Sequence, residues 1–250
     1  MNPLLAAPDF DVWDKPTGMS THNEAPSLLE MIQAQHSRPA HFLNRLDAET
    51  SGLVITIRSS DKVKAYQKLW QSESTQKIYV GLHRRPQDFT PEARVWDWAL
   101  TDKSEGRKNP QGLSKDRVPC WTKMCPLLES RHLIFSAMIL ETGRQHQIRK
   151  HAAIAKCELV GDSRYGDPKY NQNLAKHVAD LRLGLHAAAL IWAPRGTTQV
   201  LQSPLPPFFE SNLPGATTRW TEFLASRSSG PTEVERSVSG LYRLKKWDHS

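Results

Sequence analysis

Five strand-like runs, spaced unevenly along the chain, constrain most strongly what this sequence can fold into. They combine β-branched, aromatic and small apolar residues, partly in alternation, and these residues favour extended backbone. The helices expected between them differ in length and follow no regular strand–helix–strand rhythm. We therefore predict an α+β fold with a mixed, mostly antiparallel central sheet and flanking helices and loops. The runs cover residues 10–13, 53–58, 76–82, 132–140 and 183–193.

Local signals predict three helices and one long irregular segment. A capping box at residues 27–30 starts the first helix, Ser60 can cap a second helix over residues 61–71, and a third helix should cover residues 144–156. Residues 84–121 are rich in Pro, Gly, Lys, Asp and Ser. We expect an irregular excursion or a small hairpin insert there.

The 250 residues contain no clear domain boundary, and a chain of this length can bury one large core. We expect residues 1–226 to form one domain that ends in a helix after Pro214, and residues 227–250 to form a mobile tail. We find no signal peptide and no apolar run of the roughly 20 residues that a membrane helix needs. We therefore expect a cytoplasmic protein without a membrane partner. We also expect a monomer.

The composition favours one class of binding partner, and the missing motifs argue against a cofactor or a metal. There are 33 lysines and arginines against 26 acidic residues, and basic residues gather at 144–156 and 241–246, which favours a polyanionic partner. The sequence has neither a P-loop nor a Gly-x-Gly-x-x-Gly motif, so we expect no nucleotide cofactor. The spacing of the histidines and of the three cysteines fits neither a metal site nor a disulfide framework. Any chemistry should come from side chains alone.

Asp47 is the first candidate for such chemistry. It follows Arg45 by two residues and lies shortly before Thr50-Ser51-Gly52 and the strand expected at 53–58. Junctions of loops and strands are places where rigid scaffolds carry functional groups. From spacing alone, a loop carboxylate paired with Arg45 is an open alternative.

The start of the third helix and Tyr79 are further candidates. Thr142-Gly143-Arg144 is followed by His146, Arg149, Lys150 and His151, and helix starts attract anions. Contact with phosphate and a solvated basic face both remain open for this helix. Tyr79 has the opposite strand parity from its neighbours, so its ring can face a cleft and stack on a base. Partly buried strand tyrosines are a common alternative.

Several sequence blocks together resemble a known family. NRLDAETSG, at residues 44–52, is similar to the His-Arg-Leu-Asp-x-x-Thr-Ser-Gly signature of the RluA-type pseudouridine synthases, which isomerise uridine in RNA. KPTGMSTH, QKIYVGL and ETGRQHQIRKHAA resemble three further blocks of that family, and LVGDSRYGD and LHAAAL continue in its order. The resemblance runs from about residue 11 to residue 192.

The resemblance implies an isomerase that breaks the C1′–N1 bond of uridine, turns the uracil and reattaches it through C5, without a cofactor. Asp47 matches the nucleophile, and Arg149 matches the cation that keeps it ionised and oriented. Tyr79 would stack on the base, and Arg45 would take the space that the flipped base leaves. The remaining expected substrate-binding residues are Asn44 and Thr50 in the loop, with Lys77, Arg144 and Lys150 as candidates for phosphate contact.

The sequence departs from the family pattern at two positions, and one stretch bears on which RNA is the substrate. Asn44 stands where the signature usually has His, and Asp14 where Asn usually precedes Lys-Pro. We expect tuning of the loop, and the alternative is an RNA-binding protein that has lost turnover. No S4-type RNA-binding domain is expected. The Asn-x-x-Leu-Ala-x-His stretch at residues 171–177 resembles the branch called tRNA pseudouridine synthase C. It favours tRNA over ribosomal RNA, although enzymes for both share the same core.

Overall fold

The computed structural model describes residues 1–36, 39–178, 180–194 and 196–228. None of the helices in these ranges is long and apolar enough to cross a membrane. The elements are, in chain order, β1 (Leu5–Ala6), β2 (Phe10–Lys15), α1 (Leu28–His36), β3 (His41–Phe42), β4 (Ser51–Ile57), α2 (Ser60–Trp70), β5 (Gln76–Arg84), β6 (Arg94–Trp96), a 3-10 turn (Ser114–Asp116), β7 (Thr122–Glu129), β8 (Leu133–Leu140), α3 (Gln147–Ile154), α4 (Pro168–Leu174), β9 (Leu185–Trp192), β10 (Gln199–Gln202), α5 (Pro207–Asn212) and α6 (Ala216–Ser228).

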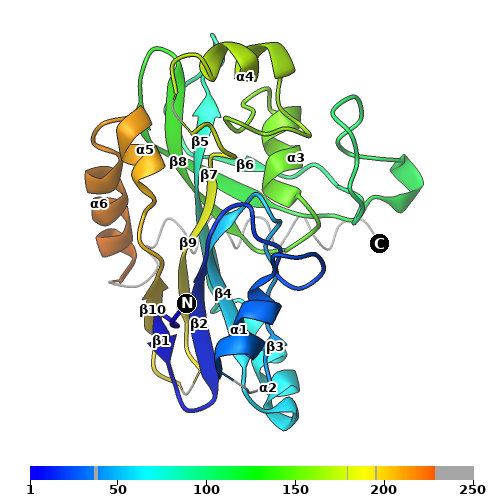
Figure 1. Cartoon of the computed structure of the whole chain (residues 1–250). Coiled ribbons are helices and arrows are strands. Elements are labelled where there is room, and N and C mark those ends of the chain that lie inside the picture. Colours follow the sequence, from blue (N-terminus) through cyan, green and yellow to red (C-terminus); the bar gives the residue numbers. More distant parts are fainter. Residues whose placement is uncertain (37–38, 179, 195, 229–250) are drawn as a thin grey trace.

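Within the described residues, ten strands form a single sheet (Figure 1). The order across it is β1-β2-β4-β9-β5-β8-β7-β6, with β3 paired to β4 and β10 paired to β9. The pair β4–β9 is parallel, and the other pairs in this sheet are antiparallel. The predicted α+β class with a mixed, mostly antiparallel sheet is confirmed.

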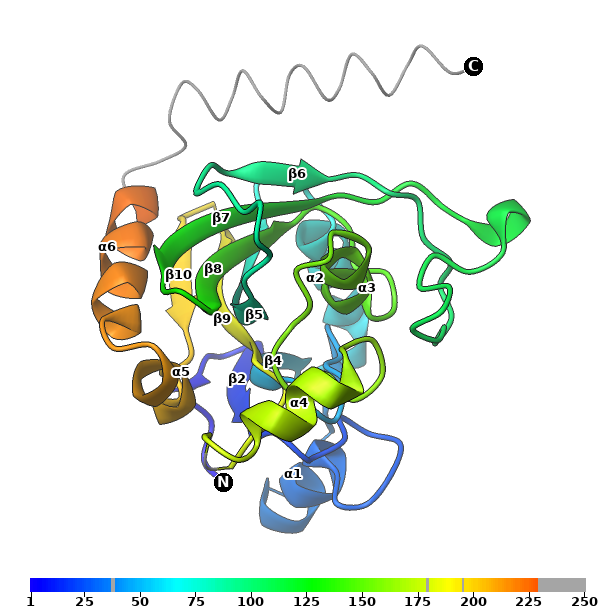
Figure 2. The same ribbon diagram turned by 90° about the horizontal axis from the view of Figure 1, so that it is seen from above.

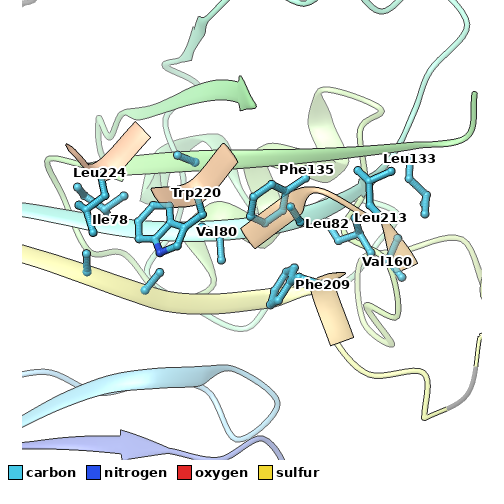
Figure 3. Close-up of a cluster of buried hydrophobic side chains, with 14 of the residues drawn as sticks. Ile78, Val80, Leu82, Leu133, Phe135, Val160, Phe209, Leu213, Trp220 and Leu224 are labelled. Atoms are coloured by element: carbon cyan, nitrogen blue, oxygen red, sulfur yellow. The ribbon is translucent and has the colours of Figure 1, made fainter. Parts of the chain in front are cut away.

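Alternation along the strands gives the sheet two apolar faces. Ile78, Val80 and Leu82 of β5 pack with α5 and α6 in one buried cluster (Figure 3), whereas Tyr79 packs with residues of α3 and α1. Figures 1 and 2 show α5 and α6 on one side of the sheet and α1 and α3 on the other. Ile148 of α3 is buried in the second cluster. The strand parity of Tyr79 therefore directs its ring to the face that carries α3.

The five expected strands are all present as β2, β4, β5, β8 and β9, with boundaries that differ by a few residues. Besides the two-residue strands β1 and β3, the strands β7 and β10 were missed. β7 contains Pro126, which weakens a strand pattern, and its pairing with β8 shifts register between Pro126 and Leu128. β10 is only four residues long. The irregular segment was correctly expected: apart from β6 and the 3-10 turn, it is loop, and it extends outward beside α3 (Figure 2).

The helix predictions need three corrections. The capping box is present, since the backbone N of Glu30 donates to Ser27 Oγ at 3.2 Å and the backbone N of Ser27 donates to Glu30 Oε2 at 3.1 Å. The second helix, however, starts at Ser60, and Ser59 is its N-cap. The third starts at Gln147, because His146 adopts a left-handed conformation. The helices α4 and α5 were not predicted. α6 continues to Ser228, and the expected tail beyond it lies outside the described residues.

Candidate functional site

Asp47 lies in the loop that enters β4, and two features of β4 fix this loop. The side chain of Asn44 donates to Leu53 O at 3.0 Å and accepts from the backbone N of Ile55 at 2.9 Å. Gly52 has φ +113°, and a Cβ there would lie 2.3 Å from Ala187 O of β9. Only glycine fits so close to the neighbouring strand. The loop is therefore fixed at Asn44 and at Gly52, with Asp47 between these two residues.

Residues after β2 hold the loop from a second side. Lys15 is completely buried, and its Nζ donates to the carbonyl oxygens of Pro16, Met19 and Ala48 at 2.6–3.2 Å. The backbone N of Gly18 also donates to Ala48 O, at 2.8 Å. Burial lowers the pKa of Lys15 to about 8, and the negative charge of Asp47 opposes this shift. The Lys-Pro-x-Gly segment therefore acts as a support for the residue next to Asp47.

Arg149 of α3 is the principal partner of Asp47. Its Nη1 lies 3.2 Å from Asp47 Oδ2, and its Nη2 lies 2.8 Å from Glu49 Oε2. Its Nε and Nη2 each donate to Asp162 at 2.8 Å. Burial alone would lower the pKa of Arg149, but the hydrogen bonds and charges of Asp162, together with Asp47 and Glu49, hold it above its ordinary value. The guanidinium is thus a fixed cation among three carboxylates.

His146 lies on the other side of the carboxylate. Its Nε2 is 3.5 Å from Asp47 Oδ1, and its Nδ1 is 2.9 Å from the hydroxyl of Tyr165. The sequence placed His146 in a basic helix start, but it did not single out this contact. No periodic pattern connects residue 146 to residue 47 or to residue 165, so only the resemblance to the family block could have drawn attention to it.

A cavity of about 110 Å³ opens beside these groups. Asp47 borders it with 28% of its side chain exposed, the half-buried ring of Tyr79 forms part of its wall, and Arg45 is exposed beside it. Burial, and secondarily the charge of Asp47, raise the pKa of Tyr79, so the phenol stays neutral. The residues that line the cavity are Arg45, Leu46, Asp47, Thr50, Tyr79, Leu140, Gly143, Arg144, His146, Gln147, Ile148, Arg149 and Leu185.

Six of the nine residues expected at the site line this cavity, including Thr50 and Arg144. Within the described residues, the buried Oγ1 of Thr50 and Nε of Arg144 have no hydrogen-bond partner. Lys77 does not line the cavity, because its Nζ packs over the ring of Trp70 at 5.2 Å. Asn44 also lies outside the lining, since both its polar atoms bond to β4.

The expectation that Lys150 contacts phosphate is contradicted. Lys150 is completely buried, and its Nζ donates to Thr101 O at 2.8 Å and to Lys103 O at 2.7 Å. Both carbonyls belong to the irregular segment, which covers the polar side of α3. The cation therefore attaches this segment to the helix and is withdrawn from solvent.

The site combines the Asp47 carboxylate, the fixed guanidinium of Arg149 and the flat aromatic wall of Tyr79. A carboxylate in this setting can act as a nucleophile, and the cavity leaves one of its sides open. In the described part of the chain, no group of three or more His, Cys, Asp or Glu side chains could hold a metal ion. What the geometry offers is nucleophilic chemistry on a planar group.

Comparisons with known proteins agree with this chemistry. Residues 9–154 match the model of the RNA pseudouridylate synthase family. A protein of Helicobacter pylori strain J99, described as an uncharacterized RNA pseudouridine synthase, is 31% identical over 233 residues, which are 82% of this chain and 74% of that protein. The tRNA pseudouridine synthase C of Yersinia pestis is 27% identical over 198 residues, 71% of this chain and 75% of that protein. The ribosomal large subunit pseudouridine synthase C of Salmonella typhimurium is 29% identical over 203 residues, 78% of this chain and 63% of that protein.

A solved structure supports the fold. The human RNA pseudouridylate synthase domain containing 4 superimposes with a TM-score of 0.69, covering 87% of this chain and 92% of that one. The sequence identity is 22%, so this likeness is one of fold alone.

Proposed function

Because the chain belongs to the RNA pseudouridylate synthase family, and is therefore an RNA pseudouridine synthase, we propose that it isomerises one uridine of tRNA with Asp47 as the nucleophile. The observation that carries this proposal is the contact of 3.2 Å between Asp47 and Arg149 at the edge of the cavity. A buried cation beside the carboxylate attracts and orients it, and an oriented carboxylate can attack as a nucleophile.

Three other lining residues would bind the RNA and hold the flipped base: Arg45, Tyr79 and Arg144. A uridine in a helix must leave its stack before its glycosidic bond can be reached, which costs a few kcal/mol. Arg45 is exposed beside the cavity and would fill the space that the base leaves. The neutral ring of Tyr79 would stack on the flipped uracil. Arg144 lines the cavity and would contact a phosphate beside it.

The choice of tRNA is supported by residues 171–177 and by the relatives that are named tRNA pseudouridine synthase C. Asn171 in this stretch also stabilises the neighbouring loop around Asp162. Its side chain donates to Asp162 O at 3.1 Å and accepts from Gly161 N at 3.1 Å, so it supports the loop that holds Arg149. The similarity to a ribosomal large subunit enzyme favours the second candidate, the same chemistry on ribosomal RNA.

Pseudouridine maps of total tRNA and ribosomal RNA, from cells with and without this gene, test the substrate. The proposal predicts the loss of one tRNA position, restored by the wild-type gene but not by Asp47→Ala. Loss confined to ribosomal RNA would contradict the tRNA assignment and leave the chemistry in place. We further propose that residues 1–226 form the catalytic domain and that the protein acts as a cytoplasmic monomer.

A further inference from the structure

His146 and Arg149 approach the same carboxylate at different oxygens. Nε2 of His146 lies 3.5 Å from Asp47 Oδ1, whereas Nη1 of Arg149 lies 3.2 Å from Oδ2. The side chain of His146 is only 10% exposed. The roles assigned above use Arg149 and leave His146 without one.

Tyr165 fixes the imidazole from behind. Its hydroxyl lies 2.9 Å from His146 Nδ1, and the residue is 1% exposed. The backbone N of Tyr165 donates at 2.9 Å to Asp162 Oδ1, and the same carboxylate binds Arg149 through two bonds of 2.8 Å. One buried carboxylate therefore orients both groups that face Asp47.

The charge state of His146 follows from its surroundings. Burial lowers the pKa of His146 below its ordinary value of 6.5, and Asp47 opposes this shift, while Arg149, Arg164 and Lys150 add to it. The ring is then neutral at neutral pH and carries one proton. If the Tyr165 hydroxyl donates to Nδ1, the proton of the ring sits on Nε2, facing Asp47.

The backbone at His146 is arranged for this contact. With φ 56° and ψ 26°, His146 adopts the left-handed conformation, which is uncommon for residues other than glycine. It is the N-cap of α3, and its carbonyl accepts from the backbone N of Lys150 at 2.9 Å. The imidazole thus leaves the helix start toward the Asp47 loop.

We propose that His146 is a positioning residue for the isomerisation, and that its Nε2–H holds Oδ1 of Asp47 while Arg149 holds Oδ2. The inference rests on the proposed role of Asp47 as the nucleophile. Two different partners on the two oxygens fix the orientation of the carboxylate. A neutral donor withdraws less charge from a carboxylate than a second cation does, so Asp47 keeps its nucleophilic character.

The test compares His146→Gln with His146→Asn. The amide nitrogen of glutamine can reach the position of Nε2, whereas that of asparagine reaches only the position of Nδ1 and cannot contact Asp47. For both variants, the single-turnover rate constant of pseudouridine formation in substrate tRNA and the Kd for that tRNA are measured. His146→Asn should lower the rate constant about 10- to 100-fold, because misplaced reacting groups cost this much. His146→Gln should stay within about fivefold of wild type, and both should keep the Kd within about threefold.

Tyr165→Phe provides a second, milder test that removes one hydroxyl. It should lower the rate constant by about threefold to tenfold, the effect of one hydrogen bond. In the His146→Gln background it should have little further effect, because the Nδ1 contact is already absent.

A wild-type rate constant for His146→Asn would overturn the proposal, and so would an equal loss in the Asn and Gln variants, since the matched amide would then fail to rescue. Asp47→Asn distinguishes a failure of the positioning role of His146 from a failure of the proposed function. If it abolishes turnover while His146→Asn does not lower it, only the positioning role fails. If Asp47→Asn retains turnover, the proposed function itself fails.

Discussion

Replacement of Arg149 by methionine should weaken both the fold and the reaction. The Arg149 and Asp162 side chains are 2% and 1% exposed, and two bonds of 2.8 Å join them. Removal of one partner of a buried ion pair costs about 3–5 kcal/mol, because the remaining charge is buried without compensation. In a chain of this size each kcal/mol lowers the Tm by about 2–4 °C, so the Tm should fall by about 6–20 °C. Urea unfolding and a thermal scan measure both quantities.

The double variant Arg149→Met with Asp162→Asn separates stability from catalysis. Asparagine removes the stranded charge and keeps an oxygen for the backbone N atoms of Arg164 and Tyr165, which donate to Asp162 Oδ1 at 2.9 Å. About 2 kcal/mol of the lost free energy of unfolding should return. The single-turnover rate should stay low, because Asp47 still lacks its cation. If activity returned together with stability, Arg149 would be a structural residue only, and our assignment would be refuted.

Three further predictions concern the loop, its support and the buried histidines. Arg45→Ala should leave the Tm unchanged, because the residue is exposed beside the cavity. It should lower the single-turnover rate about tenfold or more, because no side chain would then fill the space that the flipped base leaves. A large fall in Tm would contradict the first expectation. Lys15→Met should lower the free energy of unfolding in urea by about 2–4 kcal/mol, since it removes the donor of the Pro16 and Met19 carbonyls and leaves Ala48 O with the backbone N of Gly18 alone. An unchanged urea midpoint would argue against the support role. Burial lowers the pKa values of His83 and His151 to about 4 and that of His186 to about 3, so folding favours their neutral forms. Stability should not depend on them above about pH 6.5, and below it each should cost up to about 1.4 kcal/mol per pH unit toward pH 4. His83→Gln should therefore flatten the fall of Tm between pH 6.5 and 5.

The sequence identified the pieces of the site better than their arrangement. Asp47 and Arg149 lie 102 residues apart, and the resemblance of two blocks to one family predicted that they meet. Local physics contributed the parity of Tyr79 and the capping box of α1. These features depend on neighbours in the chain, and sequence patterns report such neighbours well.

The errors arose where distant segments decide the environment. Lys150 lies on a polar helix face, but the carbonyls of Thr101 and Lys103 cover that face. Its ammonium group therefore attaches the irregular segment to the helix and does not face solvent. The link from Asp162 through Tyr165 to His146 joins a loop to a helix start in space, without any regular spacing. Periodicity shows which side of an element is polar, but it does not show what lies against that side.

The most direct test of the central claim is the single-turnover conversion of uridine in tRNA by purified wild-type protein and by Asp47→Asn. Tritium release from tRNA labelled at C5 of uridine follows the reaction, because C5 loses its hydrogen when the new bond forms. We expect complete conversion by the wild type, none by the variant, and equal affinity for the RNA. Tritium release by Asp47→Asn at the wild-type rate would contradict the role of Asp47 as the nucleophile.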